Sequence, residues 1–187
     1  MRIERVKNFL RNNLAEKFAE LGFTKGYEIG VHKGIYSEIL CKANTKLCLK
    51  SVDPYTVVYQ DDYSRNLGLR RQESVFKQAV NRLKPYNCEI IKKTSLEAVR
   101  NVPYETLDFV YIDGSHQFDY AMADIIEWTK RVKKGGIVSG HDYDPNLMSG
   151  VVLAVKTYAE AHNIEVVYLT SESTGRARCP SWWFIKQ

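Results

Sequence analysis

The stretch from residue 27 to residue 53 constrains the fold of this chain more than any other. An apolar run over 27–31 predicts a buried strand, helical apolar spacing over 35–40 predicts a helix, and a second apolar run over 47–52 predicts another strand that ends at Asp53. This order is that of a β-turn-α-β unit. Such a unit suits a nucleoside, because a glycine-containing turn lets the backbone approach a ligand and a strand-tip carboxylate can accept hydrogen bonds from ribose hydroxyls.

The turn between this strand and helix argues against a dinucleotide. Gly30 and Gly34 form G-x-x-x-G, and His32 stands where the dinucleotide pattern G-x-G-x-x-G has its middle glycine. A side chain there keeps a pyrophosphate away from the backbone. Glu28 is also unfavourable beside a phosphate but favourable beside a cation. S-adenosylmethionine has a cationic sulfonium and ammonium, a ribose and no phosphate, so it fits better; a glycine turn without a ligand is the alternative.

Polar residues follow three further predicted strands, over 88–92, 107–112 and 137–140. In an open α/β sheet, ligands bind beyond the carboxyl ends of the strands, so these side chains should converge on one site. Three of the four histidines fall there, which packing alone does not readily explain. The residues expected to converge are Gly30, His32, Asp53, Ser95, Asp113, His116, His141 and Asp142.

Three motifs together resemble a known family. E-x-G-x-x-x-G from Glu28, with an acid ending the next strand, is similar to the first motif of class I S-adenosylmethionine-dependent methyltransferases. LDFVYIDGSH at 107–116 and WTKRVKKGGIVSGHDY at 128–143 resemble one subfamily, which carries I-D-G-x-H and G-G-x-x-x-G-H-D-Y at successive strand tips. The resemblance covers roughly residues 25–145.

The resemblance implies an α/β fold and a set of cofactor contacts. The fold is a Rossmann-like, doubly wound, seven-stranded sheet, mostly parallel, with an antiparallel C-terminal β-hairpin that the apolar runs over 166–169 and 182–185 match. The residues implied to bind S-adenosylmethionine are Glu28, Gly30, His32, Gly34, Ser37, Asp53, Ser95, Asp113, Gly114 and His116. For Ser95 a simple helix N-cap is the alternative, and for Asp113 a turn cap.

Methyl transfer to a hydroxyl needs a group that removes its proton, since the cofactor already supplies an activated methyl. His116 and His141 are the candidate bases, with His141 preferred, and Asp113 lies among the candidate catalytic residues. Relatives that methylate sugar or phenolic hydroxyls hold a divalent metal, and the matching places here are Asp113, His141 and Asp142. The metal these residues could hold is Mg²⁺ or Mn²⁺, but a histidine in place of a hard oxygen ligand weakens the case for Mg²⁺. For Asp142 an Asx-type turn is the alternative.

The remaining sequence predicts one domain over 1–187. Apolar spacing predicts an amphipathic helix over 3–21, within an N-terminal helical segment 1–24. Residues 54–69, rich in Tyr, Asp and Arg, are expected to form a lid or a solvated connector, and a helix is expected over 70–84.

Charge and cysteine usage limit which partners and which cellular compartment are expected. The net charge of +5 comes from scattered Lys and Arg residues, so a nucleic-acid partner is disfavoured. No apolar run is long enough to span a membrane, and the first residues lack the apolar core of a signal peptide. The four cysteines have no metal or redox spacing, which indicates reduced thiols in a cytoplasmic protein.

These observations predict an S-adenosylmethionine-dependent methyltransferase that methylates a hydroxyl of a small molecule or sugar. A cofactor-binding module without catalysis is one alternative. A nicotinamide oxidoreductase is another, against which the missing middle glycine and the terminal hairpin count. Nucleic-acid ribose methylation stays open, whereas base-amino methylation is disfavoured, because the strand over 107–112 runs into Asp113-Gly114-Ser115 and not Asn/Asp-Pro-Pro-Tyr/Phe.

Overall fold

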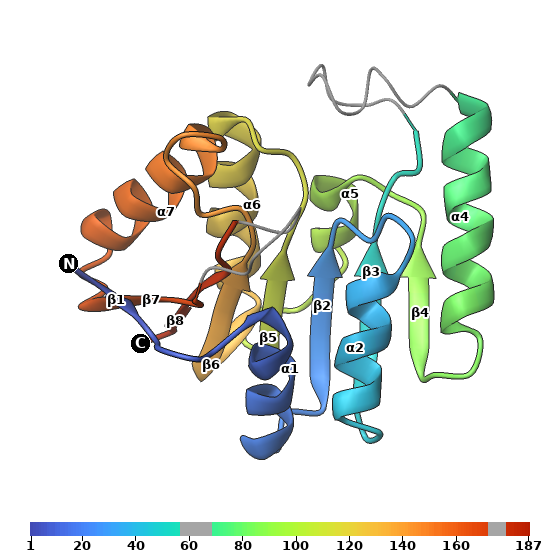
Figure 1. Cartoon of the computed structure of the whole chain (residues 1–187), viewed down its shortest axis with the longest axis horizontal. Helices are drawn as coiled ribbons and strands as arrows, with labels where there is room; N and C mark the ends of the chain where they lie inside the picture. Colours follow the sequence, from blue (N-terminus) through green and yellow to red (C-terminus); the bar gives the residue numbers. More distant parts are fainter. Residues whose placement is uncertain (57–68, 172–178) are drawn as a thin grey trace.

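The computed structural model describes residues 1–56, 69–171 and 179–187. It contains an eight-stranded sheet in the order β1-β7-β8-β6-β5-β2-β3-β4 (Figure 1). The strands are β1 (Arg2–Arg5), β2 (Lys25–Ile29), β3 (Cys48–Val52), β4 (Cys88–Ile91), β5 (Leu107–Ile112), β6 (Val132–Gly140), β7 (Val166–Leu169) and β8 (Trp182–Ile185). The helices are α1 (Arg11–Glu20), α2 (Ile35–Ala43), α4 (Leu69–Leu83), α5 (Ser95–Val99), α6 (Phe118–Thr129) and α7 (Ser149–Ala161).

The strand directions confirm the predicted fold class. β4, β3, β2, β5 and β6 pair in parallel, and β8 runs antiparallel to both β6 and β7. The closing β7–β8 pair is therefore the predicted C-terminal hairpin. β5 lies at the centre and is buried along its whole length, as expected for a strand covered on both faces.

The N-terminal segment differs from the prediction of one helix over 3–21 and adds an eighth strand. β1 pairs in parallel with β7, in the register Arg2↔Val166, and only α1, over 11–20, is helical. An edge strand has unpaired backbone groups, and here they favour pairing over the helical pattern. Leu10, which stands at helical spacing from Leu14, is 44% exposed, and Phe9 instead packs against Trp183 with ring centroids 5.2 Å apart.

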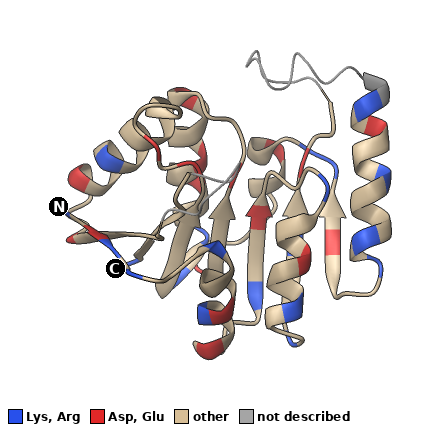
Figure 2. Ribbon diagram, viewed as in Figure 1, with Lys and Arg blue, Asp and Glu red and all other residues tan. Residues whose placement is uncertain are grey.

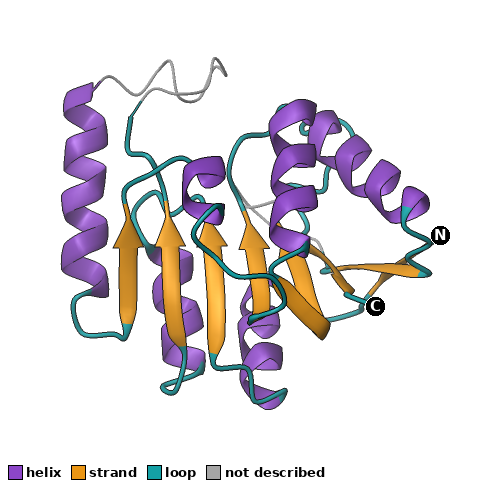
Figure 3. Ribbon diagram, turned by 180° about the vertical axis from the view of Figure 1, so that it is seen from behind, coloured by secondary structure: helices purple, strands orange, loops and turns teal. Residues whose placement is uncertain are grey.

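Helices cover both faces of the sheet, as a doubly wound fold requires. α1, α2 and α4 lie on one face and α5, α6 and α7 on the other (Figures 1 and 3). Phe18 of α1 and Leu40 of α2 pack against Phe109 and Tyr111 of β5 in one core cluster. Trp128 of α6 belongs to the cluster on the opposite face, with residues of β2, β6 and α7. Alternate side chains of the central strands therefore serve two separate cores.

Two further predictions concern the segment after β3. The predicted lid over 54–69 lies mostly at 57–68, outside the described residues. α4 confirms the helix predicted over 70–84. Acidic and basic residues are intermixed on the ribbon (Figure 2). Among the described helices, none is long and apolar enough to cross a membrane.

Candidate functional site

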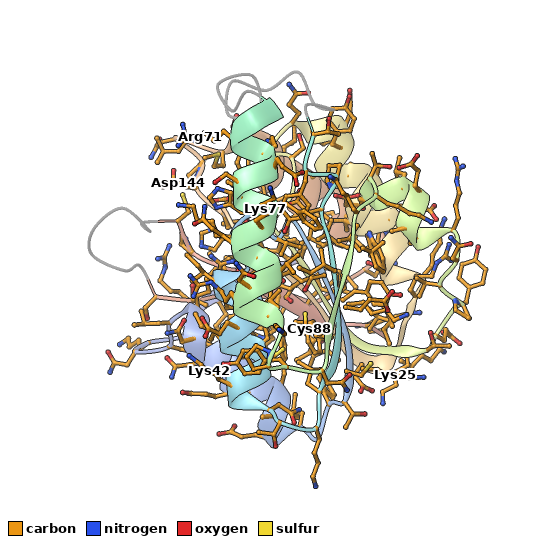
Figure 4. All side chains as sticks on the ribbon, turned by 90° about the vertical axis from the view of Figure 1, so that its right-hand side faces the viewer. Lys25, Lys42, Arg71, Lys77, Cys88 and Asp144 are labelled. Carbon is orange, nitrogen blue, oxygen red and sulfur yellow. The ribbon has the colours of Figure 1, made fainter. Side chains whose placement is uncertain are left out.

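A cavity of about 610 Å³ lies at the carboxyl ends of the central strands, within the size range of small-molecule sites. Figure 4 looks at the sheet from its α4 edge and labels Arg71 and Asp144 toward the cavity end, with Lys25 at the opposite end. The predicted residues that line this cavity are Glu28, Gly30, His32, Asp53, Ser95, Asp113, Gly114, His116 and His141. Asp142 lines a smaller adjoining cavity. The predicted convergence of strand tips is therefore confirmed.

The packing of the protein itself requires a glycine at position 30 and favours one at position 34. Gly30 has a φ of +88°, and a Cβ there would lie 1.9 Å from the backbone oxygen of Asp113. Gly34 has a φ of +70°, and its Cβ would lie 3.1 Å from the Leu83 side chain of α4. These glycines were expected to let the backbone approach a ligand, whereas their contacts show approach of β2 to the tip of β5 and of α2 to α4.

Asp53 holds that turn in place. One carboxylate oxygen accepts the backbone N–H groups of Val31 and His32 at 3.0 and 2.9 Å, and the other accepts the N–H of Tyr55 at 2.8 Å. The Tyr55 hydroxyl donates to the His32 carbonyl at 3.0 Å. A carboxylate has about four lone-pair positions, so three are in use and one remains on the oxygen that Tyr55 contacts. Asp53 therefore keeps one acceptor position while it shapes the turn, and its contact with a ribose stays a prediction.

Glu28 differs in charge state from what the sequence argument assumed. Its side chain is 1% exposed and accepts hydrogen bonds from the hydroxyls of Ser37 and Ser51, the latter at 3.0 Å. Burial raises the pKa of Glu28 to about 8, against the opposing effect of the two serine hydrogen bonds. Glu28 is then mostly neutral at pH 7 and offers little charge to a cation. That Glu28 and Ser37 contact a cofactor stays a prediction.

The hydroxyl of Ser95 is used within the protein. It donates to Asp124 of α6 at 2.5 Å and accepts the indole N–H of Trp128 at 2.8 Å. Burial raises the pKa of Asp124 to about 7. The helix N-cap is Thr94, whose side chain accepts the backbone N–H of Glu97. Ser95 is thus neither the cap nor a free donor, and only its other atoms are available to a ligand in the cavity.

Acids and bases alternate in a row across the tips of β5 and β6. Arg11 Nη2 lies 2.5 Å from Asp113 Oδ2, and Asp113 Oδ1 lies 4.0 Å from His141 Nδ1. His141 Nδ1 is 2.9 Å from Asp142 Oδ1, and Asp142 Oδ2 is 2.9 Å from His116 Nε2. The two candidate bases therefore share one carboxylate.

Asp142 orients both imidazoles. It adopts a φ of +62°, a left-handed conformation that aspartate tolerates better than most residues. Burial works against its charge, but hydrogen bonds from His116 and His141 hold the pKa of Asp142 well below its usual range. An ionised Asp142 places a proton on His141 Nδ1 and on His116 Nε2, which leaves His141 Nε2 as a proton acceptor. The alternative role, an Asx-type turn, is not the one its carboxylate performs.

Arg11 is the site residue that the sequence argument missed. Its guanidinium lies 4.0 Å from the ring centroid of Tyr36 and 5.1 Å from that of Tyr111, and the Tyr36 hydroxyl donates to its backbone carbonyl at 3.1 Å. Arg11 lines the cavity from the start of α1. No local pattern in the sequence indicates a partner 102 positions away.

The predicted metal ligands come together but are already occupied. Ligand atoms of Asp113, His141 and Asp142 lie within 4.8 Å of one another. Each hydrogen-bonds another side chain, and Arg11 is bound to Asp113. A divalent ion among these atoms would lie beside the Arg11 guanidinium, which already neutralises Asp113 and whose positive charge opposes a second cation. As they stand, these residues do not fit a metal ion.

Comparisons with known proteins agree with this geometry. A family model described as a methyltransferase domain matches residues 27–143. A search of curated proteins gives no match. The O-methyltransferase from Bacillus cereus, solved in complex with SAH, aligns with a TM-score of 0.63 at 15% identity over 94% of this chain and 80% of that one. The N-methyltransferase NodS from Bradyrhizobium japonicum WM9 aligns with a TM-score of 0.60 at 13% identity over 94% of each chain.

Proteins that are not named methyltransferases also share this fold. The spermidine synthase from Thermotoga maritima aligns with a TM-score of 0.63 at 17% identity over 95% of this chain and 60% of that one. At such low identities the structural likeness establishes only the fold. The family model, by contrast, matches the sequence itself. That model runs from β2 to just beyond the tip of β6, well over half of the chain and most of the strand tips around the cavity. The chain therefore belongs to the methyltransferase domain family, among the class I S-adenosylmethionine-dependent methyltransferases.

Proposed function

We propose that this protein transfers the methyl group of S-adenosylmethionine to a hydroxyl of a small molecule or sugar. One observation carries the proposal. His141 lies on the cavity wall with its Nδ1 atom 2.9 Å from the Asp142 carboxylate, which leaves Nε2 as a proton acceptor. A neutral amine acceptor can be bound already deprotonated, whereas a hydroxyl needs a base. The O-methyltransferase from Bacillus cereus, aligned over 94% of this chain, is consistent with this acceptor class.

The residues around the turn after β2 are assigned to the cofactor. The cavity of about 610 Å³ is large enough for S-adenosylmethionine together with a small acceptor. Asp53 has one acceptor position left for a ribose hydroxyl, and the turn residues from Gly30 to Lys33 form the wall beside it. When bound, the cofactor supplies an activated methyl, whose bond to sulfur breaks with its electron pair left on sulfur.

His141 is assigned the proton. As the acceptor oxygen bonds to the methyl carbon, His141 Nε2 takes the proton that this oxygen loses, and Asp142 stabilises the resulting imidazolium. A positioned general base contributes typically about 10²- to 10⁴-fold in rate. His116 contacts the far oxygen of Asp142 at 2.9 Å, so we assign it to hold that carboxylate and keep it as the second candidate base.

Binding and turnover test the proposal separately. Calorimetric titration with S-adenosylmethionine, S-adenosylhomocysteine and NAD should show binding of the first two and none of NAD. Release of S-adenosylhomocysteine is then screened with phenols, sugars, amines and RNA. Turnover with a phenol or sugar supports the proposal, and micromolar binding of NAD alone would overturn it.

The screen also separates the alternatives. Cofactor binding without turnover on any acceptor class indicates a module without catalysis, and turnover with RNA alone indicates ribose methylation. His141→Ala should abolish most of the turnover. His162→Ala is the matched control, because His162 is an exposed histidine at the end of α7.

A further inference from the structure

We infer that Arg11 supplies the positive charge at the strand-tip acids, so that this site holds a fixed guanidinium in the place of a divalent cation. The ion pair between Arg11 Nη2 and Asp113 Oδ2, at 2.5 Å, is the observation that carries this. Asp113 is one of three residues whose ligand atoms cluster within 4.8 Å. The guanidinium therefore occupies one face of the only such cluster among the described residues.

Arg11 is built into this position. Its guanidinium packs over Tyr36, and the hydroxyl of the same tyrosine binds its backbone carbonyl, so both ends of the residue are fixed by one side chain. Tyr111 of β5 flanks the guanidinium at 5.1 Å. Arginine stacks on aromatic rings and pairs with carboxylates better than lysine does. These contacts hold the cation against Asp113 and do not depend on a bound ligand.

The other potential ligands are directed toward each other. His141 Nδ1 and Asp142 Oδ1 are 2.9 Å apart, and His116 takes the second oxygen of Asp142. A metal ion would need to displace Arg11 from Asp113 and a proton from His141 Nδ1. Removing the guanidinium would leave the carboxylates of Asp113 and Asp142 beside His141 with one positive charge fewer. That is a mixed oxygen and nitrogen donor set, which Mn²⁺ accepts.

The consequence for the reaction rests on the proposed function. Arg11 is a positioning residue that keeps the Asp113 carboxylate in place and balances its charge at the cavity wall. Arginine stays protonated at every working pH and is not removed by chelators. Methyl transfer should therefore proceed unchanged in excess chelator, with His141 as the base.

The test is metal binding, which is measured without any methyl acceptor. The full-length, chelator-treated protein is titrated with Mn²⁺ and followed by calorimetry and by the electron paramagnetic resonance signal of free Mn²⁺. The parent should show no saturable binding up to about 1 mM Mn²⁺. Arg11→Met, which keeps an apolar stem on Tyr36, should bind one Mn²⁺ at least tenfold more tightly than the parent, and Asp113→Asn in that background should remove the new site.

Arg82→Met is the matched control. Arg82 of α4 also pairs with a carboxylate, Glu38 of α2, at 2.6 Å, but lies outside the cluster, so its loss should create no Mn²⁺ site. Saturable Mn²⁺ binding by the parent that is lost in Asp113→Asn overturns the inference. So does a folded Arg11→Met without a gain in Mn²⁺ affinity. If Arg11→Met does not fold, Arg11→Gln replaces it. Saturable Mn²⁺ binding by the parent, lost in Asp113→Asn, overturns the inference whether or not either variant folds.

S-adenosylhomocysteine binding on the same samples separates the two proposals. A parent that binds neither Mn²⁺ nor S-adenosylhomocysteine contradicts the proposed function and supports the fixed cation. A parent that binds both, with Mn²⁺ lost in Asp113→Asn, contradicts the fixed cation and supports the proposed cofactor.

Discussion

Asp53 accepts the backbone N–H of His32 at 2.9 Å, which ties the tip of β3 to the turn that follows β2. The same oxygen accepts the N–H of Val31, so the carboxylate that the sequence assigned to a ribose also determines the shape of the turn. The proposed ribose contact and the local stability of the turn therefore depend on the same side chain.

Asp53→Ala should weaken S-adenosylhomocysteine binding and lower the free energy of unfolding, because it leaves backbone N–H groups without their acceptor. Each effect is expected to be on the order of 1–3 kcal/mol, with the domain still folded. Asp53→Asn, which keeps one acceptor oxygen, should lose less. Calorimetry and urea denaturation measure the two effects, with the exposed Asp119→Ala as control. Affinity in Asp53→Ala equal to that of the parent would show that Asp53 is not the ribose acid.

Gly30→Ala should be far more damaging than another glycine substitution at a similar φ. Its Cβ would lie 1.9 Å from the Asp113 carbonyl oxygen, so the β2 and β5 tips must separate. Gly22 has a φ of +71° and no atom within 4 Å of an added Cβ, so Gly22→Ala carries the backbone strain alone, about 1 kcal/mol. Thermal and urea unfolding of both variants measure the difference. Equal losses of stability would mean that the tips move apart easily and that the clash is not the constraint.

Glu28 should make the protein less stable as the pH rises. Its carboxyl has a pKa of about 8 in the folded state, against an ordinary value of 4.5. Between these values the folded state binds the extra proton, so the free energy of unfolding falls with pH, by about 1.4 kcal/mol per unit at most. Above about pH 8 the effect is constant.

Glu28→Gln removes this dependence, because a neutral amide can still accept from the two serines. In urea denaturation from pH 5 to pH 9, the free energy of unfolding of the variant should rise relative to that of the parent by a few kcal/mol in total. Glu160 of α7 is exposed, so Glu160→Gln should show the same pH dependence of the free energy of unfolding as the parent. A difference between Glu28→Gln and the parent that does not change with pH would mean that Glu28 is ionised in the folded protein at neutral pH.

Once an acceptor is known, His141→Ala should lower kcat by about 10²- to 10⁴-fold with little change in S-adenosylhomocysteine affinity. Asp142→Asn should also lower kcat, because an amide no longer fixes the proton on Nδ1 of His141. The parent should keep its activity in chelator. Full activity of His141→Ala, with loss of parental activity in chelator that Mn²⁺ restores, would assign the proton step to a metal ion.

The sequence alone located the last seven of the eight strands along the chain and the edge of the sheet at which the site forms. Apolar runs of strand length, a turn with two glycines and an acid after the second strand define the β-turn-α-β unit, and parallel strands bring their carboxyl ends to one edge. Asp53, Asp113 and His141 could therefore be placed together from sequence, although they are far apart in the chain. The two late apolar runs predicted the last two strands, and their antiparallel pairing was what the family resemblance implied.

Only the tertiary structure decided how these residues are used. Helical spacing predicted a helix at the N-terminus, but the free edge of β7 made Arg2–Arg5 a strand, because unpaired backbone groups outweigh a weak propensity. Burial made Glu28 mostly neutral at pH 7, and close approach to Asp113 required Gly30. The Arg11–Asp113 ion pair joins residues 102 positions apart. Desolvation and long-range contacts leave no local pattern in a sequence, so the fold must be known before they can be assigned.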